Sequence, residues 1–228
     1  TLRFHKTRQT FNSNIRYQDY MYKVKEIFYT LQGEGFHAGR SAVFCRFSGC
    51  NLWTGREEDR EKAICKFCDT DFWGMDGNNG GKYTAESLTQ KIISLWPDPE
   101  VPVFVVCTGG EPGLQVDTDL VESLHAASVE IAIETNGTVD LPEGIDWICV
   151  SPKSNTTLVI TKGDELKLVY PQVENVPSDY EHLEFDHFSL QPMDDAQQQD
   201  NIRETVAYCM QHPKWKLSLQ THKILGIE

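Results

Sequence analysis

Three cysteines form the most informative pattern in the chain. Fourteen residues separate Cys50 from Cys65, and two more separate Cys65 from Cys68, so that the pattern closes on a CxxC pair. Clustered thiolates of this kind are typical of metal sites. Three thiolates are one fewer than a closed structural zinc site or the usual iron–sulfur cluster takes. Cys50, Cys65 and Cys68 therefore predict a cluster whose fourth metal atom stays open to a ligand that is not protein.

The alternative is a zinc site completed by Cys45 or His37. The composition of the surrounding segment favours a cluster, because an apolar shell excludes solvent and tunes the cluster's potential. That segment contains four aromatic residues: Phe47, Trp53, Phe67 and Phe72. Residues 55–62 are highly charged and predict a small solvated helix outside the site. The other four cysteines are expected to be buried as small apolar residues: Cys45, Cys107, Cys149 and Cys209.

A second pattern is the turn Gly109-Gly110-Glu111-Pro112. Adjacent glycines let a ligand approach the backbone closely, and Glu111 could accept a hydrogen bond from an ammonium group. Alone, this pattern is also compatible with an ordinary glycine-rich loop. Together with the three cysteines it indicates a ligand site beside the cluster.

Alternating strands and helices must position these residues. Short segments rich in Val, Ile and Phe predict strands at Lys23–Phe28, Ala42–Phe47, Val103–Cys107, Glu130–Glu134, Asp146–Val150, Glu165–Val169, His187–Leu190 and Trp215–Gln220. Apolar periodicity predicts helices at Thr84–Trp96, Asp117–Ala127 and Asn201–Gln211. Thr84 is the expected N-cap of the first helix. In the third, Ile202, Val206, Cys209 and Met210 are expected to share a face.

This alternation favours an α/β fold with a parallel sheet. A complete eight-fold barrel takes about 250 residues, and several crossovers here are too short for a helix, so an incomplete (β/α) barrel is expected. Residues 22–228 would form this domain, and residues 1–21 an N-terminal extension. Polar clusters follow five strands, and strand ends carry the chemistry in such folds. They are residues 108–112, 135–137, 151–153, 191–194 and 221–223.

The net charge of −13 argues against nucleic-acid binding, because an acidic surface repels phosphate. No apolar run reaches the roughly 18–20 residues of a membrane span, and the odd cysteine count favours the cytoplasm. An anionic ligand would need a locally built pocket. Four polar residues can each be interpreted without a functional site. Arg46 could form a surface ion pair and Thr70 could cap a turn. Lys153 could be a solvated loop charge, and His222 could be a surface histidine.

The cysteine trio and the Gly-Gly-Glu-Pro turn resemble radical S-adenosylmethionine (SAM) enzymes, although three residues usually separate the first two cysteines. Six further motifs resemble the 7-carboxy-7-deazaguanine synthase family, in which some members carry a longer insert. They are Leu31-Gln32-Gly33-Glu34-Gly35, Arg46–Leu52, Cys68-Asp69-Thr70, Glu134–Gly137, Ser151-Pro152-Lys153 and Gln191–Asp194, with the ending Thr221–Gly226. The resemblance covers residues 22–228.

The resemblance implies three cofactors: a [4Fe–4S] cluster, SAM and Mg²⁺. The cluster would bind Cys50, Cys65 and Cys68, and the Mg²⁺ would bind the Thr70 hydroxyl. SAM would be surrounded by Gly110, Glu111, Asn136, Ser151, Lys153, Gln191 and Asp194. The substrate would contact Leu31, Gln32, Gly33, Glu34, Arg46, Thr108 and His222, together with the terminal carboxylate of Glu228.

The activity implied by the resemblance is a radical ring contraction. A 5′-deoxyadenosyl radical would take hydrogen from C6 of 6-carboxy-5,6,7,8-tetrahydropterin, and loss of ammonia would give 7-carboxy-7-deazaguanine, with SAM regenerated. The family further implies a homodimer and an electron donor such as flavodoxin or ferredoxin. Two alternatives stay open: a radical SAM activase that makes a glycyl radical on a partner protein, and a zinc-binding module without enzymatic activity.

Overall fold

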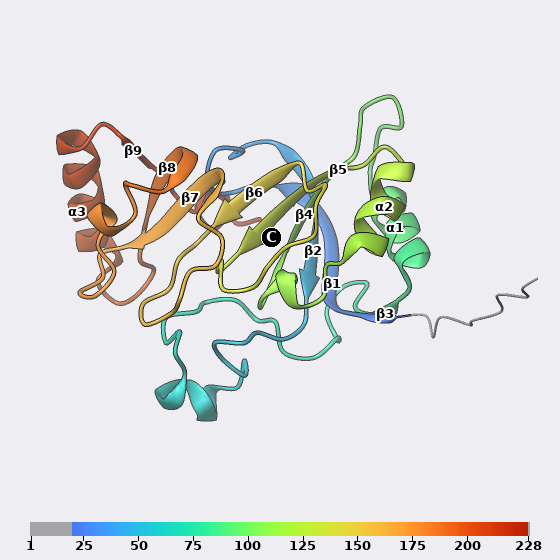
Figure 1. Cartoon of the computed structure of the whole chain (residues 1–228), viewed down its shortest axis with the longest axis horizontal. Helices are drawn as coiled ribbons and strands as arrows, with labels where there is room; N and C mark the ends of the chain where they lie inside the picture. Colours follow the sequence, from blue (N-terminus) through green and yellow to red (C-terminus); the bar gives the residue numbers. More distant parts are fainter. Residues whose placement is uncertain (1–19, 228) are drawn as a thin grey trace, which may run out of the picture.

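The computed structural model describes residues 20–227, so most of the expected extension and Glu228 lie outside the described residues. Within that range, nine strands form one curved sheet in the order β3-β1-β2-β4-β5-β6-β7-β8-β9 (Figure 1). The strands are β1 (Tyr22–Leu31), β2 (Ser41–Phe47), β3 (Gly81–Tyr83), β4 (Phe104–Gly109), β5 (Glu130–Thr135), β6 (Trp147–Val150), β7 (Lys162–Tyr170), β8 (Glu184–Pro192) and β9 (Trp215–Leu217). All pairs from β2 to β9 are parallel, and β1 is antiparallel to both of its neighbours.

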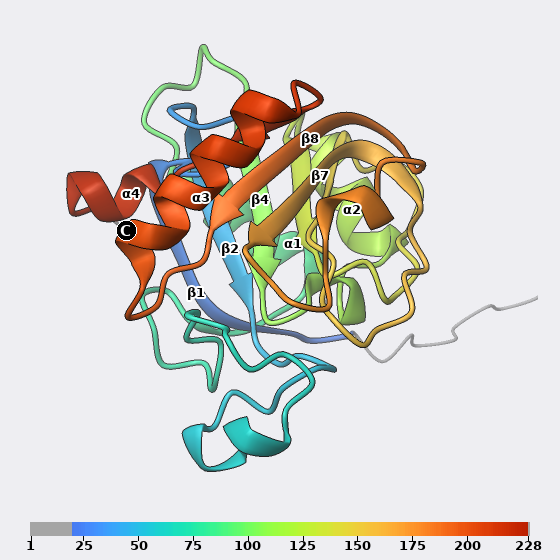
Figure 2. The same cartoon turned by 90° about the vertical axis from the view of Figure 1, so that its left-hand side faces the viewer.

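The helices α1, α2 and α3 cover the convex face of this sheet (Figures 1 and 2). The α-helices are α1 (Ala85–Ser94), α2 (Thr118–Ala126), α3 (Gln198–Gln211) and α4 (Thr221–Leu225), and the 3₁₀ helices are η1 (Glu57–Lys62), η2 (Pro112–Leu114) and η3 (Pro177–Asp179). No helix joins β5 to β6 or β6 to β7. The expected incomplete barrel is therefore confirmed. Within residues 20–227, no helix is long and apolar enough to cross a lipid bilayer.

The eight predicted strands are all present, with ends that differ by a few residues. The Thr84 hydroxyl caps α1 as predicted, by accepting a hydrogen bond from the Ser87 N–H. The predicted last strand is too long, because β9 ends at Leu217 and the chain then turns into α4. Four elements were not predicted, since each is too short to show a period: the edge strand β3, the short helix α4 and the 3₁₀ helices η2 and η3.

The predicted inner face of α3 is wrong in part. Met210 is 80% exposed, whereas the polar residues Asn201 and Thr205 are buried. The Asn201 amide donates to the Met193 carbonyl at 2.9 Å, and the Thr205 hydroxyl donates to the Asn201 carbonyl at 2.6 Å. The first bond ties the helix to the residue that follows β8 and the second lies within the helix, so the contact made by Asn201 sets which face of α3 points inward.

The two faces of the sheet differ in polarity. On β7, Leu166 and Leu168 pack into the convex core. Glu165 and Lys167, which alternate with these leucines, point into the barrel. Successive side chains of a strand lie on opposite faces, and in a barrel one of those faces is the interior. The convex core under α1 and α2 is apolar and includes Ile27, Leu88 and Leu120. Polar side chains are thus collected on the concave face.

Gly109 ends β4 beside β2, with a φ of 134°. A Cβ atom there would overlap the Phe47 carbonyl oxygen and lie 2.6 Å from the Phe47 nitrogen. The position requires glycine because both the backbone conformation and the space exclude a side chain. This close approach fixes the start of the glycine-rich turn.

We expect Gly109→Ala to lower the free energy of unfolding by about 3 kcal/mol or more, since backbone strain and overlap add. Gly39→Ala is the matched control, because Gly39 also has a positive φ, of 89°, but has nothing within 4 Å of the added atom. Backbone strain alone should lower the free energy of unfolding of Gly39→Ala by about 1 kcal/mol. Urea unfolding of both variants measures the difference, and equal losses would contradict the packing argument.

Candidate active site

The carboxyl ends of the parallel strands meet around a cavity of about 170 Å³. Six of the expected cofactor residues line it: Gly110, Asn136, Ser151, Lys153, Gln191 and Asp194. Cys65, Cys68 and Thr70 line the same cavity from the segment after β2. Figure 2 shows that segment as a lobe beyond the end of β2. We call this space the first cavity.

A second cavity of about 240 Å³ lies beside the first. Its walls include all the described residues expected to contact substrate: Leu31, Gln32, Gly33, Glu34, Arg46, Thr108 and His222. The expected contact from Glu228 lies outside the described residues and stays a prediction. The two cavities share six wall residues: Glu34, Asp69, Thr70, Thr108, Glu134 and Gln220. A ligand in one cavity would therefore lie next to a ligand in the other.

The three cysteines lie close enough to interact electrostatically, with Cys65 buried and Cys50 and Cys68 half-buried. Burial raises the pKa of the Cys50 and Cys65 thiols. The Gly-Gly turn packs on the same loop, since a Cβ atom at Gly110 would lie 3.0 Å from the Cys50 Cβ. The intervening helix η1 buries none of its residues, as predicted. The trio and the glycine turn thus form one wall.

The geometry does not favour the zinc alternative. Cys45 is fully buried in the convex core opposite Cys107, and His37 packs against the rings of Phe104 and Trp147. Across residues 20–227, no three His, Cys, Asp or Glu side chains converge tightly enough to hold a single metal ion. Thiolates that bind different irons of a cluster stand further apart than ligands of one ion.

Glu111 differs from the sequence expectation. Its side chain is fully buried behind the cavity wall and accepts hydrogen bonds from the Gly113 N–H at 2.8 Å, the Thr135 hydroxyl at 2.7 Å and the Asn136 N–H at 2.7 Å. Burial raises the pKa of Glu111, although these bonds and Lys153 oppose the shift. The carboxylate therefore shapes the turn and positions Asn136, and it is not open to an external ammonium group.

Arg46 and Thr70 both line the second cavity. Arg46 Nε donates to Glu26 at 2.7 Å, which leaves its terminal nitrogens without an acceptor among residues 20–227. Ion pairs hold both neighbours of Thr70, with Asp69 2.6 Å from Lys223 and Asp71 2.8 Å from Lys25. The Lys223 ammonium holds the pKa of Asp69 below its usual range against the opposing effect of burial.

Sequence reasoning gave no site role to several polar wall residues, among them Asp69, Glu134, Lys167 and Gln220. One signal could have identified Lys167. In the β7 sequence Glu165-Leu166-Lys167-Leu168, charged residues alternate with leucines in mid-strand, and charged side chains inside a barrel need paired partners. Gln220 carries no such signal, because its position depends on where α4 begins.

Comparisons with known proteins agree with these motifs. The chain is 59% identical over 207 residues to the 7-carboxy-7-deazaguanine synthase of Burkholderia multivorans, a match that covers 90% of this chain and 99% of that protein. It is 56% identical over 213 residues to the enzyme of the same name from Nitratidesulfovibrio vulgaris. Its fold resembles the crystal structure of QueE from Escherichia coli, with a TM-score of 0.66 and 25% identity over 87% of this chain and 93% of that one. No family model matches the chain.

We expect Glu111→Ala to lower the free energy of unfolding by about 3 kcal/mol, because it leaves three buried donors unpaired. Glu122→Ala, at an exposed position of α2, is the control and should change it by less than about 0.5 kcal/mol. Urea unfolding measures both. A loss at Glu111 no larger than that at Glu122 would show that its hydrogen bonds do not hold the turn.

Proposed function

Because the chain belongs to the 7-carboxy-7-deazaguanine synthase family, we propose that it converts 6-carboxy-5,6,7,8-tetrahydropterin to 7-carboxy-7-deazaguanine with loss of ammonia. SAM would occupy the first cavity and the pterin the second. The observation that carries this proposal is the shared wall of the two cavities, which puts Cys65, Cys68, the Gly-Gly turn and the expected pterin residues around two adjoining spaces. Radical transfer between two ligands needs that proximity.

The residues of the first cavity suit SAM. Gln191 is buried there, and its Oε1 has no hydrogen-bond partner among residues 20–227. A buried acceptor without a partner is costly, so a ligand donor such as an amine or hydroxyl would satisfy it. Lys153 is held by the Ser151 carbonyl and hydroxyl at 2.7 and 2.6 Å, which places a cation for a ligand carboxylate.

The thiols of Cys50, Cys65 and Cys68 would hold the [4Fe–4S] cluster. When bound, a cluster with one open iron supplies the electron that cleaves the SAM sulfonium. The protein's own part is to keep the thiols together and water away. Trp53 and Phe72 pack edge to face beside the loop, and Phe67 lines the cavity with Lys153 6.0 Å from its ring centre. Together they make an apolar shell.

The second cavity supplies groups for a pterin carboxylate and a polar ring edge. The terminal nitrogens of Arg46 match a carboxylate in geometry and charge. Gln32 and Thr108 offer hydrogen bonds to ring atoms. Mg²⁺ could bind the Thr70 hydroxyl, substrate oxygen and water, which are the ligand types that this ion prefers. The neighbouring carboxylates of Asp69 and Asp71 are engaged by lysines, so within residues 69–71 the Thr70 hydroxyl is the side-chain oxygen without an ion pair.

Four further features remain proposals. Residues 22–228 act as one domain, with residues 1–21 as an extension. The enzyme works as a homodimer, and flavodoxin or ferredoxin delivers the electron from the side of the Cys50 loop, where a third surface cavity lies. A cytoplasmic location is consistent with the seven cysteines being free thiols. The glycyl-radical activase and the zinc module are not favoured, because neither accounts for the second cavity.

Anaerobic reconstitution with iron and sulfide, followed by assay with SAM and the pterin, tests the proposal. The reconstituted chain should absorb as an iron–sulfur protein and form the product, detected by its ultraviolet spectrum. Cys50→Ala, Cys65→Ala and Cys68→Ala should each abolish both the cluster absorbance and product formation. Cys45→Ala and Cys209→Ala should keep the cluster, because those thiols lie on the convex side. Cluster loss in either control would overturn the ligand assignment, and zinc without sulfide would support the zinc module.

Magnesium should stimulate turnover through Thr70. Thr70→Ala should raise the half-saturating Mg²⁺ concentration about tenfold, the effect of losing roughly 1.4 kcal/mol of binding. SAM binding and cluster absorbance should be unchanged. Thr161→Ala is the control, since Thr161 is exposed at the far end of the barrel before β7. An unaltered magnesium response in the Thr70 variant would place the ion elsewhere.

A further inference from the structure

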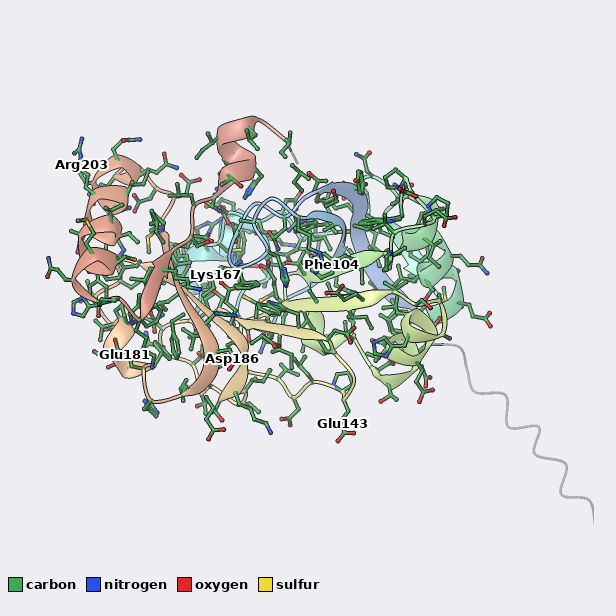
Figure 3. All side chains as sticks on the ribbon, turned by 90° about the horizontal axis from the view of Figure 1, so that it is seen from above. Phe104, Glu143, Lys167, Glu181, Asp186 and Arg203 are labelled. Atoms are coloured by element: carbon green, nitrogen blue, oxygen red, sulfur yellow. The ribbon has the colours of Figure 1, made fainter. Side chains whose placement is uncertain are left out.

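Lys167 is a buried cation that the proposed chemistry does not use. It lies on β7, is 4% exposed and points into the barrel from the concave face. Figure 3 shows it deep among the strands, whereas Arg203 and Glu143 project from the periphery. A buried ammonium is costly unless it is paired and hydrogen-bonded. The residues that pair with Lys167 therefore indicate the role of this buried cation.

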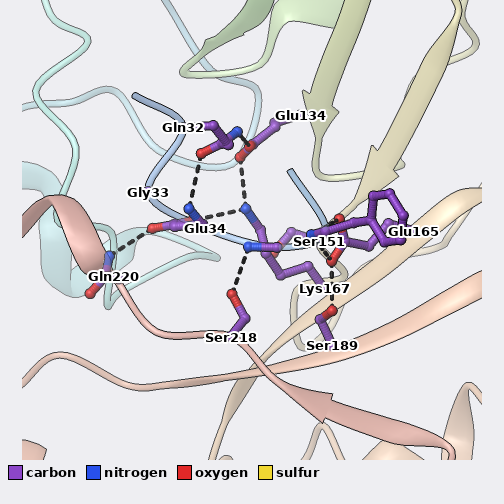
Figure 4. A network of polar contacts seen from close by, with 12 residues as sticks. Gln32, Gly33, Glu34, Glu134, Ser151, Glu165, Lys167, Ser189, Ser218 and Gln220 are labelled. Carbon is purple, nitrogen blue, oxygen red and sulfur yellow. Dashed lines mark hydrogen bonds and ion pairs between the residues drawn. The ribbon is translucent and has the colours of Figure 1, made fainter. Parts of the chain in front are cut away.

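Lys167 bridges two carboxylates from different parts of the chain. Its Nζ lies 2.7 Å from Glu34 Oε2, after β1, and 3.0 Å from Glu134 Oε2, on β5 (Figure 4). The other oxygens are also held, since Gln220 donates to Glu34 Oε1 at 2.9 Å and Gln32 donates to Glu134 Oε1 at 2.8 Å. Each carboxylate oxygen accepts one bond within the protein and keeps a further acceptor site.

Glu34 and Lys167 hold each other in their charged forms. Burial alone would raise the pKa of Glu34, but Lys167 and Gln220 hold it below its ordinary value. Burial would lower the pKa of Lys167, but Glu134 and Glu34 hold it well above its ordinary value. The other titratable groups that act on these residues are Glu165, Cys149 and His222. One cation thus allows two like charges to lie side by side.

The loop that carries Glu34 is fixed independently. The Gly35 N–H donates to the Ser218 hydroxyl at 2.8 Å, and the Phe36 N–H donates to the buried Glu165 carboxylate at 3.0 Å. Ser189 also donates to Glu165, at 2.6 Å (Figure 4). Because these hydrogen bonds hold the backbone at Gly35 and Phe36, Lys167 needs to set only the direction of the Glu34 side chain.

Glu34 and Glu134 line both cavities, so their open acceptor sites face the junction where two ligands would meet. We propose that Lys167 is a positioning residue that presents this pair of carboxylates to the ring N–H donors of the substrate that lie beside C6. The proposal rests on the proposed function. A rigid, charged acceptor pair discriminates strongly, because a ligand without matching donors leaves it buried and unpaired.

The test compares Lys167→Met with Lys167→Arg in the reconstituted enzyme. Loss of the cation should raise the pterin KM and Kd by about ten- to hundredfold, the range that 1–3 kcal/mol of unpaired buried charge produces. SAM affinity should fall by a smaller factor than pterin affinity, because Lys167 lines the first cavity but its Nζ is engaged by the two carboxylates. Lys167→Arg should recover part of the pterin affinity, since it restores a cation. Lys162→Met, an exposed lysine of the same strand, is the matched control.

A double-mutant cycle with Glu134→Gln separates positioning from mere folding. Lys167→Met/Glu134→Gln keeps the net charge of the wild-type trio and so guards against a variant that fails to fold. If Lys167 acts through the carboxylates, the double variant should bind the pterin more tightly than the product of the two single effects predicts. Independent effects, or an equal loss of SAM and pterin affinity, would overturn the positioning role. A wild-type enzyme that bound no pterin would instead overturn the proposed function.

Discussion

The division of the sheet into an apolar convex face and a polar concave face is the constraint on which the rest of this structure depends. Because side chains alternate along a strand, Leu166 and Leu168 cannot reach the core under α3 without sending Lys167 inward. Charged groups inside a barrel need partners, and the Glu34–Lys167–Glu134 bridge supplies them. Burial that stabilises the fold on one face therefore creates the need for an ordered polar network on the other.

The segment between β2 and β3 completes the mouth, and two lysines tether the part of it that follows Cys68. Lys25 on β1 pairs with Asp71 and Asp76, and Lys223 on α4 pairs with Asp69 and Asp194 at 2.6 and 2.5 Å. These bonds connect the stretch after Cys68 to both edges of the barrel. A cysteine loop and a hydroxyl donor are thus held over the strand ends without regular secondary structure.

Local patterns identified much of the fold and site because those features have local causes. Thr84 and Asp117 cap helices where their residue types predict, and the strand-end clusters converge because parallel strands share one edge. Other features depend on contacts across the chain. The burial of Glu111 follows from donors in its own turn and at the end of β5, the rotation of α3 follows from Asn201, and Gln220 enters the site only because β9 ends early. No spacing within the sequence specifies such contacts.

The most direct test of joined cavities is a crystal structure of the anaerobically reconstituted protein with SAM and the pterin. The account predicts a cluster on Cys50, Cys65 and Cys68, SAM against Gln191 and Lys153, and the pterin in the second cavity. The N–H edge of the pterin should lie within hydrogen-bond distance of the carboxylate pair beside Lys167. A pterin bound outside the second cavity, or separated from SAM by protein, would contradict it.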